Sequence, residues 1–129
     1  MSKKAIEKLT GFCIVTGASS GIGLELTKLA AKDGVALLLV ADRDLSEAES
    51  AAKAHGASQV ETLKTDLGTR NGIEKLVEAI GERPVDALIA NAGHGLGDAF
   101  LTQKWEDIAH VIDTNVKGTV SLVHKIGGD

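Results

Sequence analysis

Three glycines with the spacing Gly-x-x-x-Gly-x-Gly follow a short apolar run near the start of the chain. They are Gly17, Gly21 and Gly23, and the residues among them are Ala18, Ser19, Ser20 and Ile22. The pattern predicts a strand, a tight turn and the start of a helix. In such a turn, glycine lets the backbone approach a ligand, and the unpaired N–H groups of the helix attract a phosphate. A plain strand-to-helix turn also favours glycine, so this segment by itself leaves both interpretations open.

Polar side chains stand at the ends of the next three predicted strands, which cover residues 35–41, 60–63 and 86–90. They are Asp42, Asp66 and Asn91. Strands that alternate with helices form parallel sheets, which bind ligands at the carboxyl ends of the strands. The glycine turn and these three polar residues are therefore expected to lie together in one site.

Asp42 lies about 20 residues past the glycine turn, where dinucleotide-binding units carry the acid that bonds the ribose hydroxyls. Asp42 could instead cap the following helix, but Asp44 and Ser46 suit that position equally well. The upstream glycines favour the ribose role. Arg43 could contact the 2′-phosphate of NADP, whereas the Asp42 carboxylate would repel it. We therefore predict NAD as the cofactor, with NADP as the alternative.

The alternation of short apolar runs and longer amphipathic segments predicts an α/β fold, with residues 1–129 as one domain. Strands are expected at 12–15, 35–41, 60–63 and 86–90, and helices at 22–34, 46–55, about 71–80, 105–112 and from 115 onward. The first helix is expected to bury Ile22, Leu26, Leu29 and Ala30, and the third to be capped by Thr69 or Asn71. Continuous apolar strands indicate a Rossmann-like, doubly wound parallel sheet with helices on both faces.

Composition excludes several classes of partner. The 129 residues carry a net charge of −4 without a basic cluster, which argues against a nucleic-acid partner. The lack of a transmembrane-length apolar run or a signal peptide predicts a cytoplasmic protein that does not contact membranes. Cys13 is expected to be a buried small hydrophobe, and the four His lack metal-ligand spacing, so no metal site is expected. His94 is interpreted as a solvated loop residue and Trp105 as a packing anchor.

Several segments, in the expected order, resemble motifs of the short-chain dehydrogenase/reductase family. They are residues 16–23 with their glycine spacing, Asp66-Leu67, Asn91-Ala92-Gly93, and residues 113–118 around Asn115. The resemblance runs from about Leu9 to the end of the chain. The family usually has a second Asn before Asn91, and here Ala90 stands in that position.

The resemblance implies a strand order of 3-2-1-4 and a role for each matching residue. The turn formed by Gly17, Ser19, Ser20, Gly21, Ile22 and Gly23 would hold the pyrophosphate. Asp42 and Arg43 would face the ribose, and Asp66-Leu67 would hold the adenine ring. Asn91, Ala92 and Gly93 would steady the sheet and line the cofactor site. Asn115 would be the catalytic Asn, which kinks a helix and holds a water of the proton relay.

The implied activity is hydride transfer between NAD(P) and a small alcohol or carbonyl substrate. The family's acid/base is a Tyr assisted by a Lys and a Ser, and the chain contains no Tyr. We therefore expect the C-terminal, catalytic part of the fold to be missing from these residues. The alternative is a non-catalytic nucleotide-binding module or a structural fragment. Self-association or a homo-oligomer is also expected, because the fourth strand would lie at a sheet edge.

Overall fold

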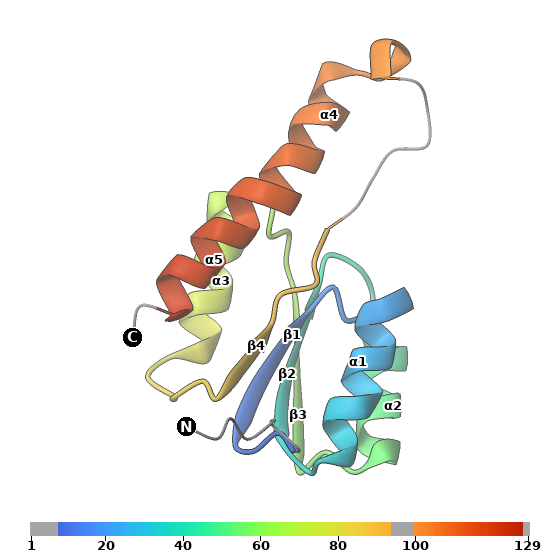
Figure 1. The fold of residues 1–129 in the computed structure, drawn as a ribbon, viewed down its shortest axis with the longest axis vertical. Coiled ribbons are helices and arrows are strands. Elements are labelled where there is room, and N and C mark those ends of the chain that lie inside the picture. The colour runs from blue at the N-terminus through green and yellow to red at the C-terminus, as the bar shows by residue number, and fades with distance from the viewer. Residues whose placement is uncertain (1–7, 94–99, 128–129) are drawn as a thin grey trace, which may run out of the picture.

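Four parallel strands form one sheet in the order β3-β2-β1-β4 (Figure 1). They are β1 (Phe12–Thr16), β2 (Ala36–Ala41), β3 (Gln59–Lys64) and β4 (Ala87–Ile89). The structure is a computed structural model that describes residues 8–93 and 100–127. Ile14, at the centre of β1, pairs with Leu38 of β2 and Leu88 of β4. The topology confirms the predicted Rossmann-like sheet and the strand order that the resemblance implied.

Helices cover both faces of this sheet (Figure 1). They are α1 (Gly21–Lys32) and α2 (Ser46–His55) on one face, and α3 (Arg70–Ile80) and α5 (Thr119–Gly127) on the other. Because side chains alternate along a strand, Cys13 and Val15 join the core beneath α1 and α2. Ile14 instead packs with Leu76 and Leu122 beneath α3 and α5. Burial on both faces explains why β1 and β2 read as continuous apolar runs.

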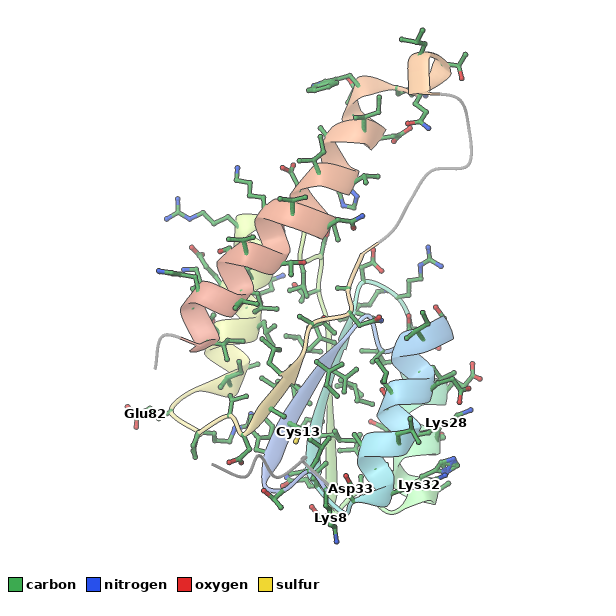
Figure 2. All side chains as sticks on the ribbon, in the orientation of Figure 1. Lys8, Cys13, Lys28, Lys32, Asp33 and Glu82 are labelled. Carbon is green, nitrogen blue, oxygen red and sulfur yellow. The ribbon has the colours of Figure 1, made fainter. Side chains whose placement is uncertain are left out.

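Cys13 is fully buried on β1, within the sheet layer (Figure 2). Burial raises the pKa of its thiol, and the negative charges of Asp86 and Asp33 raise it further. This confirms that Cys13 is a small buried hydrophobe.

The helix ends follow most of the predicted caps. Thr69 caps α3 by accepting a hydrogen bond of 2.9 Å from the backbone N–H of Gly72, so the alternative cap, Asn71, was wrong. Gly34 and Gly56 close α1 and α2 in left-handed conformations, at φ of 76° and 110°. At the start of α2 the N-cap position is held by Leu45, and Asp44 accepts hydrogen bonds from the backbone and side chain of Ser46.

The buried face of α1 differs from the prediction. Ile22 and Leu29 are 72% and 57% exposed, whereas the buried residues are Gly23, Leu24, Thr27, Ala30 and Ala31. The helix meets the sheet mostly through small residues, which let the two backbones approach closely. Large residues were wrongly expected on this face because the periodicity of apolar residues does not show which side of the helix packs against the sheet.

A long helical rod follows the short 3₁₀ turn η1 (Phe100–Thr102). The rod comprises α4 (Trp105–Ile112), the π-helical segment η2 (Asp113–Gly118) and α5, and runs without a break (Figure 1). The expected new helix at Asn115 was therefore wrong. Trp105 is 67% exposed rather than a packing anchor, because the α4 end of the rod extends past the sheet. Within the described residues, no helix is long and apolar enough to span a membrane.

Candidate functional site

The glycine turn lies between β1 and α1, and backbone conformation or close packing explains why glycine stands at each of its three positions. Gly17 and Gly21 adopt left-handed φ values of 65° and 56°, which side chains rarely tolerate. A Cβ on Gly23 would collide with the carbonyl oxygen of Gly17, so only glycine lets α1 begin this close to the turn. At Gly21 an added Cβ would meet no atom within 4 Å, so open space lies above this part of the turn.

Thr16 joins the turn to the end of β4. Its buried hydroxyl accepts hydrogen bonds of 2.9 Å from the backbone N–H groups of both Asn91 and Ala92. The side-chain amide of Asn91 donates a 3.4 Å bond back to the carbonyl of Gly17. Thr16 thus fixes the segment from Asn91 to Gly93 beside the glycine turn. Sequence reasoning gave Thr16 no role, although a polar residue at the end of an apolar strand was a signal.

Asp42 and Arg43 extend from the carboxyl end of β2 with mostly exposed side chains. The Arg43 Nε lies 3.9 Å from Asp42 Oδ1, which is the loose contact of an exposed ion pair. Both residues line the same groove as the glycine turn. A carboxylate and a guanidinium thus stand together where the second strand meets the site.

The loop after β3 holds Asp66 in a fixed orientation. Asp66 Oδ1 accepts a 2.8 Å hydrogen bond from the Gly68 backbone, and its carbonyl accepts one of 2.9 Å from the Thr69 hydroxyl. Asp66 Oδ2 lies 3.0 Å from His110 Nε2 on α4. Leu67 is buried beside it.

The π-helical segment η2 brings the rod against this loop. A Cβ on Gly118 would collide with the carbonyl oxygen of Leu67, so glycine permits the close approach. One turn earlier, Asn115 lies beside the segment after β4, with its Oδ1 2.8 Å from where a Cβ of Gly93 would stand. π-helical turns often occur at functional sites. The segment thereby places helix residues beside two of the sheet's carboxyl ends.

These segments surround one groove of about 550 Å³, a volume in the range of small-molecule sites. Eleven of the predicted residues line it: Gly17, Ser19, Ser20, Ile22, Asp42, Arg43, Asp66, Leu67, Asn91, Ala92 and Gly93. The predicted residues Gly21, Gly23 and Asn115 are not among its lining residues. Four lining residues were not predicted, namely Ala41, Thr65, His110 and Thr114.

The groove has the features that a dinucleotide requires. The N-terminus of α1 carries no acidic residue in its first turn, and open space faces Gly21, which suits a pyrophosphate. Asp42 and Arg43 stand at one wall, and Asp66 and Leu67 at another. His94 lies outside the described residues. Among the residues that are described, no three His, Cys, Asp or Glu side chains group as metal ligands.

Comparison with known proteins gives consistent matches. The family model described as "short chain dehydrogenase" matches residues 12–127. A 3-dehydrosphinganine reductase of Arabidopsis thaliana is 31% identical over 111 residues, covering 84% of this chain and 33% of that protein. An uncharacterized oxidoreductase of Listeria innocua is 38% identical over 112 residues, covering 84% of this chain and 45% of that protein.

The fold also matches solved structures. L-sorbose reductase from Gluconobacter frateurii, in a complex with NADPH and L-sorbose, aligns with a TM-score of 0.82 at 28% identity. The alignment covers 92% of this chain and 47% of that one. The chain thus spans less than half the length of each of these three relatives.

Proposed function

Because the chain belongs to the short-chain dehydrogenase/reductase family, we propose that it forms the cofactor-binding part of an NAD(P)-dependent oxidoreductase. The reaction is hydride transfer between the nicotinamide cofactor and a small alcohol or carbonyl substrate. The family match supports this function over a non-catalytic binding module. The observation that carries the proposal is the single groove onto which the carboxyl ends of all four strands open.

Each wall of the groove has a proposed task in cofactor binding. The turn from Gly17 to Gly23 holds the pyrophosphate, because it combines open space at Gly21 with the N-terminus of α1. Asp42 and Arg43 contact the adenosine ribose, and Asp66 with Leu67 holds the adenine. The segment of Asn91, Ala92 and Gly93 lies beside the turn through the Thr16 hydrogen bonds and lines the cofactor site.

Asn115 is the proposed catalytic residue of this chain. It lies in the π-helical segment η2 beside Gly93, near the groove but not among its lining residues. Its role in the family is to hold a water of the proton relay. The bound nicotinamide ring supplies the hydride donor or acceptor. The family's Tyr is not among the 129 residues, so this chain contributes cofactor binding and one relay residue.

We further propose that NAD is preferred over NADP. The exposed carboxylate of Asp42 stands where the adenosine ribose is expected, and it would repel the 2′-phosphate of NADP. Two features support the alternative. Arg43 lies beside Asp42, and the related L-sorbose reductase was crystallised with NADPH.

A cytoplasmic location and self-association are also proposed. Self-association with a second copy is supported by the apolar side chains exposed along the rod: Ile112, Val116, Val120 and Val123. Sedimentation equilibrium over a range of concentrations tests it. A single monomeric species at every concentration would contradict self-association.

Isothermal titration of the chain with NAD and with NADP tests the cofactor proposal. We expect binding with a dissociation constant below about 1 mM, and tighter binding of NAD. The absence of heat with either cofactor at millimolar concentration would refute the proposed function. Tighter binding of NADP would refute only the cofactor preference.

A further inference from the structure

Three polar side chains meet around Gly68, at the wall of the groove formed by the loop after β3. A Cβ on Gly68 would lie 2.5 Å from Thr114 Oγ1, 3.0 Å from Asp66 Oδ1 and 3.1 Å from His110 Nε2. All three side chains line the groove. His110 and Thr114 come from the rod and have no part in the function proposed so far.

His110 contacts the carboxylate oxygen of Asp66 that the Gly68 backbone does not bond. Its Nε2 lies 3.0 Å from Asp66 Oδ2, while Oδ1 is held by the Gly68 backbone at 2.8 Å. An ionised carboxylate only accepts hydrogen bonds, so Nε2 carries the proton and donates it. The carboxylate is therefore fixed through both of its oxygens, in a position that a bound base would meet.

Thr114 presents a buried hydroxyl that lacks a protein partner. The residue is 8% exposed, and its Oγ1 is the single buried side-chain N or O atom without a hydrogen bond in the described parts of the chain. Leaving a buried hydroxyl unpaired destabilises a protein, so such a group calls for an explanation. Because Thr114 lines the groove, a ligand there can supply the missing partner.

The rod keeps both side chains in place. His110 and Thr114 are four residues apart and so lie on one side of the rod. Just beyond them, the rod contacts the carbonyl of Leu67 at Gly118, and the Thr119 hydroxyl donates a 3.2 Å hydrogen bond to the carbonyl of Thr114. This packing fixes the distance between the rod and the loop that carries Asp66.

We infer that His110 and Thr114 complete the base-binding end of the groove. His110 is a positioning residue that aims the Asp66 carboxylate at the exocyclic amine of adenine. Thr114 is a binding residue whose hydroxyl bonds the adenosine. The inference rests on the proposed function, since it assigns the adenosine half of the cofactor to this end of the groove.

A cofactor analogue tests the part played by His110. Nicotinamide hypoxanthine dinucleotide carries a carbonyl in place of the adenine amine and a proton on the neighbouring ring nitrogen N1, and it otherwise matches NAD. We expect the wild-type chain to bind NAD at least about tenfold more tightly, because a hydrogen bond to a charged group is lost with the analogue. His110→Leu should reduce this ratio to within about threefold, and His110→Gln, which keeps an N–H donor, should preserve it.

The selectivity ratio separates positioning from a structural role. If His110 has a merely structural role, His110→Leu will weaken the binding of both dinucleotides equally. The ratio of their affinities would then stay unchanged, which would overturn the role of His110. A wild-type chain that binds both dinucleotides equally would overturn it as well.

Thr114 is tested by a matched pair of variants. Thr114→Val removes the hydroxyl at nearly constant volume. It should lower the affinity for NAD about three- to tenfold, without lowering the melting temperature of the free chain. Thr114→Ser keeps the hydroxyl and should bind within about twofold of the wild type. Wild-type affinity in Thr114→Val would overturn the role of Thr114. Failure of the wild-type chain to bind any dinucleotide would instead refute the proposed function itself.

Discussion

The hydroxyl of Thr16 accepts a 2.9 Å hydrogen bond from the backbone N–H of Asn91, which is 75 residues away in the sequence. The same hydroxyl accepts a second bond from Ala92 and lies 3.4 Å from the carbonyl of Ile89. One side chain at the end of β1 therefore holds the end of β4 and shapes the groove between them.

Replacing Thr16 should destabilise the protein more than the small size of the threonine side chain suggests. Thr16→Val keeps the volume but leaves two backbone N–H groups without an acceptor, and we expect a loss of about 3 kcal/mol in the free energy of unfolding. Thr16→Ser keeps the hydroxyl and should lose about 1 kcal/mol. Denaturant unfolding measures both values. Hydrogen exchange at Asn91 and Ala92 should accelerate in Thr16→Val alone, and equal stability of Thr16→Val and the wild type would contradict the assignment.

Gly21 should be required for cofactor binding beyond its effect on stability. Gly21→Val fills the open space above the turn, and we expect the affinity for NAD to fall at least about tenfold. Gly81→Val is the matched control, since Gly81 has a similar φ of 62° but lies away from the groove. Titration calorimetry should find the NAD affinity of Gly81→Val within about twofold of the wild type. An equal loss in both variants would show that backbone strain alone is responsible.

Asp42 should determine the choice between the two cofactors. Asp42→Asn removes the charge that repels a 2′-phosphate, so the affinity for NADP relative to NAD should rise about tenfold at low salt and less at high salt. Asp44→Asn changes the same charge two residues away. Asp44 is not a lining residue of the groove, so this variant should leave the ratio unchanged. Fluorescence titration with the reduced cofactors measures the ratio. An unchanged NADP-to-NAD affinity ratio in Asp42→Asn would show that the ribose 2′-position of the cofactor lies away from Asp42.

The thiol of Cys13 should be unreactive in the folded protein. Its side chain is 0% exposed, and burial raises its pKa, so little thiolate exists at neutral pH. With a disulfide reagent at pH 8, we expect labelling at least about tenfold slower than in denaturant. Rapid labelling under native conditions would mean that β1 opens readily.

Asp44 should contribute a stabilisation that acid removes. The hydrogen bond from the Ser46 hydroxyl, followed by that from its backbone N–H, holds the pKa of Asp44 below its ordinary value of 3.8. Because the pKa is depressed on folding, the stabilisation is fully present above pH 3.8 and is lost as the pH falls through the folded value. Ser46→Ala should raise the Asp44 pKa in an NMR titration, and Ser50→Ala on the same helix should leave it unchanged. An equal Asp44 pKa in the wild type, Ser46→Ala and Ser50→Ala would contradict this role of Ser46.

Local signals in the sequence were sufficient to predict most of the fold. The strands β1 and β2 are apolar runs buried on both faces, and the ends of the first three helices carry threonine or glycine signals at Thr69, Gly34 and Gly56. The groove lining was predicted largely because parallel strands bring their carboxyl ends together. Residues such as Asp42, Asp66 and Asn91 therefore share a site whatever the details of packing.

The residues that were missed act through contacts between distant parts of the chain. His110 pairs with Asp66 across 44 residues, and no local pattern shows that pairing. Thr114 lies in a π-helical turn, and that turn also explains why a new helix was wrongly predicted at Asn115. The exposed face of α1 was misjudged because small residues, rather than large ones, contact the sheet.

Parallel pairing also fixes the order in which the site can be built during synthesis. Among the four strands that the structure describes, β1 is the first to leave the ribosome and its partner β4 is the last. Until Asn91 and Ala92 emerge, the Thr16 hydroxyl lacks the two N–H groups that complete the turn. Contacts of such long sequence separation form slowly, because the intervening loop must close first. The glycine turn can therefore be completed only after the residues about 75 positions further along the chain have been made.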